Sequence, residues 1–237
     1  MAEQGAVVTQ VGVSDANIFT ALSPKEASAA FKDANDGDFV NIHSDEETYY
    51  RVTTKKYLHI NVTGNAVAWI DAPHSVVAGW DQSLVSVITA RRTELYDAAV
   101  GAVGDGSTLV VRDHARGTAL AGGRLFAAEA GELSAFGKST VTAQGHSRVF
   151  LGGDPDGLGE ESAVSAYDDA LVTFARVVNC AVESFSSRVR VFGNPTRYSE
   201  PWHISNVDVS ERPDTSVTVR ADEQLIDHVP AAVPVGI

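Results

Sequence analysis

The chain has 237 residues, of which 44% are apolar and 21% charged, a composition that is ordinary for a soluble globular protein. Its formal net charge of -13 repels nucleic acid phosphates and anionic membrane surfaces, so neither is expected as a partner. No stretch reaches the ~18 to 20 apolar residues of a membrane span, and residues 1–10 lack the basic and apolar regions of a signal peptide. We therefore expect a protein that is made and folded in a cytoplasm.

Residues 1–56 are predicted to form an N-terminal arm followed by a cap of helix and strands. Ser23 can cap a helix, Pro24 suits its first turn, and Glu26 completes a capping box. A helix over about 24–34 is therefore predicted, and its apolar face consists of Ala27, Ala30, Phe31 and Ala34. Alternating stretches at 38–42, 48–52 and 57–62 are typical of strands. A helix across the end of a stack of strands would shield the unpaired edge of that stack.

An eight-residue unit repeats through residues 57–193 and keeps an unbroken frame from His74 to Gly153. In its pattern, x-S-x-V-x-A-x-G, position 2 is small, positions 4 and 6 are apolar and position 8 is a turn residue. A short strand with alternating sides, followed by a corner, fits this pattern, whereas a helix of period 3.6 does not. The fourth positions are nearly all apolar or Gly and are predicted to form the core: Val77, Val85, Thr93, Gly101, Leu109, Gly117, Leu125, Leu133, Val141, Val149, Val164, Val172, Cys180 and Val189.

Short repeats that cannot bury their own faces must stack, which predicts an all-β fold, a single-chain β-solenoid. The pattern leaves open whether two or three octads close a coil. We favour three, because two short sides leave little room between them for Leu95, Leu125 and Phe174. Three octads give about 24 residues per coil, about five coils and a rod near ~25 Å long. Residues 194–237 leave the frame, contain five prolines and are predicted to be an irregular segment that docks or caps.

The octads, several of which carry an aromatic residue at position 7 such as Phe136 and Tyr167, resemble the SATVRAYG-type repeats of β-solenoid proteins predicted in actinobacterial phages and their hosts. The resemblance covers residues 57–193, and Arg91, Thr93 and Glu94 depart from the pattern. It implies a tail, baseplate or capsid-surface decoration protein, located in the virion, multicopy or homo-oligomeric, and attached to other virion or assembly proteins through its terminal segments. The family offers no catalytic motif to transfer.

The insertion at residues 154–160 interrupts the octads and gathers carboxylates around a Gly turn. Such loops supply oxygen ligands to Ca²⁺, and the candidate ligands are Asp154, Asp156 and Glu160. The full twelve-residue calcium loop is missing, so a solvated acidic loop is the favoured interpretation, with a Ca²⁺ site as the alternative. No other cofactor is expected, because the histidines show no metal-binding spacing and Cys180 falls at an inward position.

Acidic residues recur at the corners of the octads. A coil of 24 residues stacks Asp81, Asp105 and Glu129, whereas a coil of 16 stacks Asp81, Asp97, Asp113 and Glu129. Either ladder is compatible with the paired carboxylates of a polysaccharide-cleaving solenoid. Asp is also a common turn residue, and we favour that structural interpretation.

Aromatic residues predicted to face outward are candidates for contacts with a partner: Trp80, Tyr96, Phe136, Tyr167 and Trp202. The sequence lacks Gly-x-Ser-x-Gly, and its serines are spread along the repeat as small inward residues. We therefore expect a non-enzymatic structural protein of a virion. The alternative is a glycan-binding or glycan-cleaving solenoid that uses the aromatic residues and the acidic corners.

Overall fold

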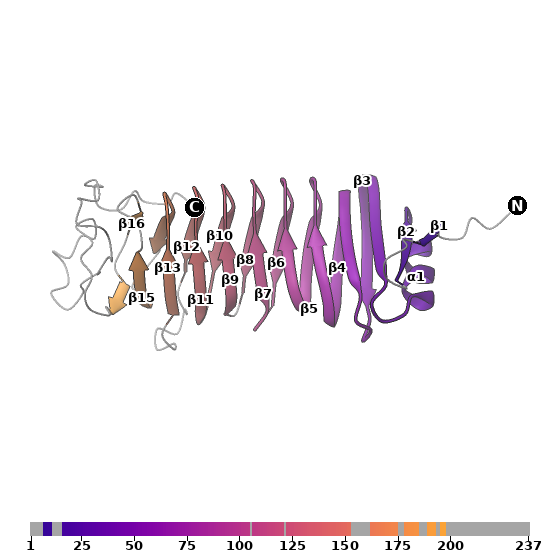
Figure 1. Ribbon diagram of the computed structural model, residues 1–237, viewed down its shortest axis with the longest axis horizontal. Coiled ribbons are helices and arrows are strands. Elements are labelled where there is room, and N and C mark those ends of the chain that lie inside the picture. The colour runs from indigo at the N-terminus through magenta and orange to yellow at the C-terminus, as the bar shows by residue number, and fades with distance from the viewer. Residues whose placement is uncertain are drawn as a thin grey trace, which may run out of the picture.

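The chain folds as a β-solenoid of about eight turns with one short helix near the N-terminus, as the computed structural model shows (Figure 1). The structure describes residues 7–10, 16–104, 106–120, 122–152, 162–174, 178–184, 189–192 and 195–197. The predicted fold class is confirmed. At ~4.8 Å per coil, eight turns make a rod roughly 40 Å long.

Each coil contributes a parallel strand to each of two columns, which we call face A and face B. Three long strands pass round a corner from one face to the other: β3 (Phe39–Thr53), β4 (His59–Gly79) and β5 (Leu84–Leu95). The other strands of face A are β2 (Asn17–Ala21), β7 (Thr108–Val111), β9 (Gly123–Ala127), β11 (Ser139–Ala143), β13 (Ser162–Ala166), β15 (Val178–Ser184) and β17 (Pro195–Arg197). Those of face B are β6 (Val100–Val103), β8 (Arg116–Ala119), β10 (Glu132–Ala135), β12 (Arg148–Leu151), β14 (Leu171–Phe174) and β16 (Arg190–Phe192).

Two octads close a coil, so the prediction of three octads was wrong. Glu132 pairs with Arg116 in one direction and with Arg148 in the other, and each partner lies 132 - 116 = 148 - 132 = 16 residues away. Two sides suffice because glycines make room for the large residues between them. A Cβ on Gly101 would lie 2.9 Å from both Cδ atoms of Leu95, so the missing side chain leaves the space that Leu95 fills.

The core is a thin double row of small and branched side chains between the two faces. Every fourth-position residue whose burial the structure describes is buried, which confirms that part of the predicted core column. Near the C-terminal end the frame differs from the prediction. Cys180 pairs with Ser162 and Val182 with Val164, so Val182 takes the fourth position that we assigned to Cys180.

Helix α1 (Pro24–Asp33) closes the N-terminal end of the core, as predicted (Figure 1). Ser23 Oγ accepts a hydrogen bond from the Glu26 N–H at 3.3 Å, which caps the helix. Ala27 and Ala30 are buried against the core. At the other end of α1, Lys56 Nζ donates to the carbonyl groups of Phe31, Lys32 and Ala34, which the last turn leaves unpaired.

The parallel ladder begins before the octads become recognisable in the sequence. β2 pairs in parallel with β3, and β3 with β4, so coils are already stacked N-terminal to residue 57. β1 (Val7–Gln10) pairs antiparallel with β2. Asp38 is buried beside this first coil and accepts hydrogen bonds from the N–H groups of Asn17 and Asn35, each at 2.7 Å. Burial acts to raise the pKa of Asp38, but these N–H groups hold it below its ordinary value.

Candidate functional site

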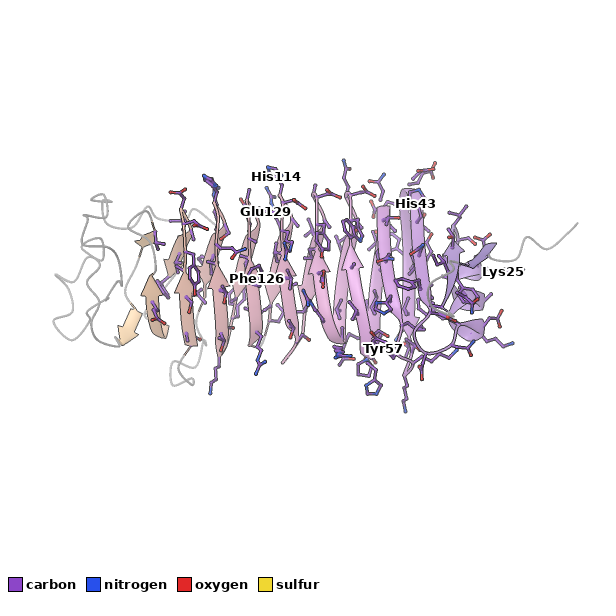
Figure 2. All side chains as sticks on the ribbon, in the orientation of Figure 1. Lys25, His43, Tyr57, His114, Phe126 and Glu129 are labelled. Atoms are coloured by element: carbon purple, nitrogen blue, oxygen red, sulfur yellow. The ribbon has the colours of Figure 1, made fainter. Side chains whose placement is uncertain are left out.

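The corners that lead from face A to face B form a continuous acidic edge, which we call the acidic corner. Each corner is a four-residue turn; at the first one the Ser83 N–H donates to the Trp80 carbonyl at 3.1 Å. The second residue of the turn has a positive φ, in the left-handed region that Asp and Gly tolerate better than most residues. This left-handed position is occupied by Asp81, Asp97, Asp113, Glu129, Gly145 and Asp168. Figure 2 shows His114 and Glu129 along this edge.

The carboxylates of the acidic corner are hydrogen-bond acceptors for the neighbouring coil. Asp97 Oδ2 accepts from the Asp81 N–H at 3.4 Å, Asp113 Oδ2 from the Asp97 N–H at 3.1 Å, and Glu129 Oε2 from the Asp113 N–H at 3.1 Å. The same contact joins Asp81 to Gly64 and Asp168 to Gly145, both at 3.0 Å. The observed column is therefore the one predicted for a coil of 16 residues. Residue 105, which belonged to the other column, lies outside the described residues.

These contacts explain how carboxylates about 5 Å apart can share an edge. Each charge is offset by a backbone N–H of the preceding corner. Hydrogen bonds to Glu129 and to the Asp97 N–H lower the pKa of Asp113. A glycosidase acid needs a raised carboxyl pKa, so the chemistry of Asp113 is the opposite of that role.

Two of the predicted contact residues meet beside the acidic corner. The rings of Trp80 and Tyr96 are stacked, with centroids 4.0 Å apart and an interplanar angle of 9°. The Tyr96 hydroxyl donates to Glu94, whose carboxylate forms a 2.7 Å ion pair with Arg92. Burial and the hydrogen bond to Glu94 raise the pKa of Tyr96 to about 12. The pair is therefore a fixed, neutral aromatic surface.

The remaining contact candidates are spread over the rod. Tyr167 precedes Asp168 and lies at the acidic corner of a later coil. Phe136 lies at the opposite corner, where its ring meets that of Phe150 edge-on with centroids 6.3 Å apart. A Cβ on Gly152 would lie 2.2 Å from the Phe136 ring, so this glycine makes room for it. Trp202 lies outside the described residues.

The predicted calcium ligands Asp154, Asp156 and Glu160 also lie outside the described residues. β12, which ends before the insertion, belongs to face B, and β13, which begins after it, belongs to face A. Within the part of the chain that the structure describes, no three His, Cys, Asp or Glu side chains are grouped to hold a metal ion.

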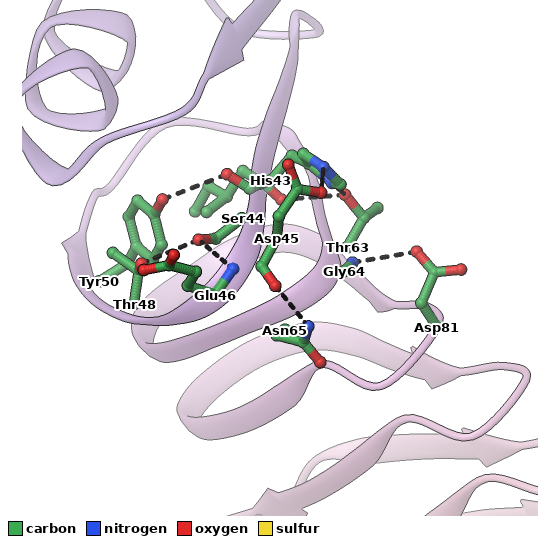
Figure 3. Close-up of polar contacts among 11 residues, drawn as sticks. His43, Ser44, Asp45, Glu46, Thr48, Tyr50, Thr63, Gly64, Asn65 and Asp81 are labelled. Atoms are coloured by element: carbon green, nitrogen blue, oxygen red, sulfur yellow. Dashed lines mark hydrogen bonds and ion pairs between the residues drawn. The ribbon is translucent and has the colours of Figure 1, made fainter.

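A polar cluster at the N-terminal end of the acidic corner was missed by the sequence reasoning (Figure 3). His43 Nδ1 lies 2.9 Å from Thr63 Oγ1, and His43 Nε2 lies 3.2 Å from Asp45 Oδ1. The order hydroxyl, imidazole and carboxylate is that of a nucleophilic triad. Asp45, however, is 96% exposed, so water competes for its contact with His43. The Gly64 N–H, next to Thr63, already donates to Asp81 instead of facing a substrate oxygen.

The same cluster fastens a bulge to the rod. Asn65 Nδ2 donates to the Asp45 carbonyl at 2.6 Å, and Ser44 Oγ lies 2.8 Å from Thr48 Oγ1. Between Ser44 and Thr48 the register of β3 shifts against β4. The signal in the sequence was the extra spacing between strands, which the regular octads do not have.

Among the described residues, no helix is long and apolar enough to cross a membrane. No family model, no curated protein and no solved structure matches the chain. The candidate site is therefore characterised by its own geometry: a carboxylate ladder bonded to the backbone and a stacked aromatic pair beside it.

Proposed function

We propose that this chain is a non-enzymatic structural protein of a phage virion, a tail, baseplate or capsid-surface decoration component attached to other virion proteins through its terminal segments. The observation that carries the proposal is the continuous parallel ladder, in which one coil follows another from β2 to β17. Such a ladder makes a stiff rod with a fixed length per coil. The octad resemblance supports the virion setting.

The polar groups along the rod support a mechanical role. The acidic corner joins successive coils through hydrogen bonds from backbone N–H groups to carboxylates. Ser75, at an inward position, does the same: its Oγ accepts from the Leu58 N–H at 3.2 Å and donates to the Lys56 carbonyl at 2.9 Å. Side chains that serve as acids or nucleophiles in enzymes are here bonded between coils.

The test is whether the protein co-sediments with phage particles. Particles from a lysate that contains the protein are separated on a density gradient, and its peptides are quantified by mass spectrometry beside those of the capsid. We expect a constant ratio to capsid protein across the particle peak, and loss from that peak for a chain truncated after residue 197 that keeps its β-sheet circular dichroism. A protein that stays in the soluble fractions at every particle concentration would overturn the proposal.

A glycan-binding role is the second candidate, and the stacked Trp80 and Tyr96 beside carboxylates favour it, since aromatic faces and acceptors recognise sugars. Retention on immobilised host-envelope polysaccharide is measured for the wild type, Trp80→Ala, and Trp69→Ala on face B as a matched control. A glycan-binding role predicts that the wild type and Trp69→Ala are retained and that Trp80→Ala is not. Shortened polysaccharide chains would indicate cleavage, and the absence of both effects would eliminate this candidate.

A further inference from the structure

The outward side of face B is divided into an apolar half and a charged half. One column along the rod contains, in successive coils, Tyr49, Val67, Leu84, Val100, Arg116, Glu132, Arg148 and Leu171. In the apolar half Tyr49 is 67% exposed, Leu84 45% and Val100 43%. Trp69, in the neighbouring column, is 57% exposed. An apolar surface of this extent is typical of a protein contact.

The charged half alternates in sign. Arg116 Nε lies 3.2 Å from Glu132 Oε2, and Arg148 Nη1 lies 3.5 Å from Glu132 Oε1. With Arg51 and Asp71 included, the outward charges of face B from β3 to β14 sum to 3 - 2 = +1, in a chain whose net charge is -13. Two copies of this acidic chain can therefore approach each other through face B without bringing their acidic corners together.

We propose that face B is the interface of a homodimer in which two rods pack antiparallel, with Arg116 of one copy opposite Glu132 of the other. The alternating charges select this arrangement. Parallel rods in register would set Arg116 against Arg116 and Glu132 against Glu132, which repel. A two-fold axis between the coils of Arg116 and Glu132 sets opposite charges together twice.

The same axis matches the other residues of the face by size and polarity. It brings Leu84 against Leu171 of the second copy and the small Ala102 against the ring of Phe150, since each lies the same number of coils from the axis. The aliphatic part of Arg148 then covers Val100. A single surface that complements itself in this way is what a two-fold dimer requires.

The area corresponds to a small interface. The overlap spans the six coils from Leu84 to Leu171, which is about 30 Å along the rod at ~4.8 Å per coil. The length of the strands makes the face roughly 15 Å across. The flat area of the two faces together is on the order of 900 Å², without the additional surface of protruding side chains. This is close to the ~1,000 Å² expected of a specific interface. The proposal does not depend on the proposed virion role.

The test uses the full chain and light scattering during gel filtration, at protein concentrations from about 1 to 100 µM, which detect a dimer with a Kd in the micromolar range. The wild type is expected to have twice the monomer mass of 25.0 kDa. Arg116→Glu and Glu132→Arg each set like charges together and should weaken the dimer by about 100-fold. Arg124→Glu, the same charge change on face A, should leave the mass unchanged. Leu84→Glu is a further variant if either reversal fails to fold.

An equimolar mixture of the two charge-reversed chains gives the sharper result. In a mixed antiparallel pair both contacts are again between opposite charges, so the dimer mass should return although each chain alone is monomeric. To fix the orientation, Ser86→Cys and Thr173→Cys chains, both with Cys180→Ala, are joined with a short bis-maleimide; the axis sets these two positions opposite each other, whereas either position lies five coils, about 24 Å, from its own counterpart. We expect crosslinks in the mixture and not within either chain alone. A monomeric wild type, a dimer unaffected by both reversals, or crosslinking of Ser86→Cys to itself would each overturn the proposal.

Discussion

Replacing Asp113 tests whether the acidic corner holds neighbouring coils together. Asp113 accepts from the Asp97 N–H at 3.1 Å and has a φ of 52°, a left-handed conformation that costs about 1 to 2 kcal/mol for most residues. Asp113→Ala loses an acceptor worth about 1 kcal/mol at this partly exposed site and tolerates the left-handed backbone less well than Asp does, so it should lower the free energy of unfolding by about 1 to 2 kcal/mol. Asp113→Gly loses the same bond but relieves the strain, and Asp113→Asn keeps an acceptor, so each should cost less than about 1 kcal/mol.

The assay is urea unfolding followed by far-ultraviolet circular dichroism, at pH 7 and at lower pH. The pKa of Asp113 is lowered in the folded chain, so its contribution is fully present above the pKa of the unfolded chain, ~3.9. That contribution is lost as the pH falls through the lower folded value, and the difference between wild type and Asp113→Asn should shrink there. The reasoning is refuted if alanine costs no more than glycine at pH 7, because the hydrogen bond and the strain would then not be the relevant terms.

Three further tests, two of them with a second substitution for comparison, probe the core and the cap by the same unfolding assay. Gly117→Ala places a Cβ 2.5 Å from Val111 Cγ2 and should lower the free energy of unfolding by about 1 to 3 kcal/mol. Gly106→Ala, in open space at a φ of 68°, should lower it by about 1 kcal/mol. Equal losses for the two variants would contradict the packing argument. Ser147 Oγ is buried without a partner among the described residues, so Ser147→Ala should be neutral or stabilising by up to ~1 kcal/mol. Ser75→Ala removes two hydrogen bonds and should lower the free energy of unfolding by about 1 to 3 kcal/mol. A loss for Ser147→Ala as large as that for Ser75→Ala would contradict this expectation. Asp38→Asn should lower the free energy of unfolding by about 2 kcal/mol at pH 7, because Asp38 accepts two backbone hydrogen bonds. The pKa of Asp38 is lowered in the folded chain, so the difference between wild type and variant should vanish as the pH falls below that lowered pKa. A difference independent of pH would argue against a charged acceptor.

The features that could be predicted from the sequence are those that depend on neighbours along the chain. Alternation of period two decides which side chains of a strand point inward, and it placed Val77, Leu133 and Val149 in the core correctly. The capping of α1 depends on Ser23 and Glu26, three residues apart. Positions of this kind are fixed before any coil stacks on another, so the octad pattern shows them directly.

The number of octads per coil could not be predicted in this way, because it depends on which residues meet across the core. Leu95 fits between two faces only because Gly79 and Gly101 lie beside it. These glycines were visible in the sequence, but nothing local indicated that they belong to the surroundings of Leu95. The column of carboxylates was one of the two predicted, but its hydrogen bonds to the backbone escaped prediction for the same reason. Asp113 can be recognised as a turn residue, whereas the N–H that it accepts belongs to a corner 16 residues earlier.

The two faces and the acidic corner of a coil are constrained by different physics, and this separates structural residues from those available for contacts. Inward positions must be small or apolar, and the left-handed position of the acidic corner favours Asp or Gly. The outward positions of face B have no such requirement within one chain, since polar residues would serve a solvated strand equally well. Tyr49, Leu84 and Val100 are nevertheless apolar and exposed there, and the next coils carry Arg and Glu in alternation. The charged residues also pair with one another within a single chain, whereas the fold of a single copy does not explain the exposed apolar residues, and we interpret these as a property of the assembled protein.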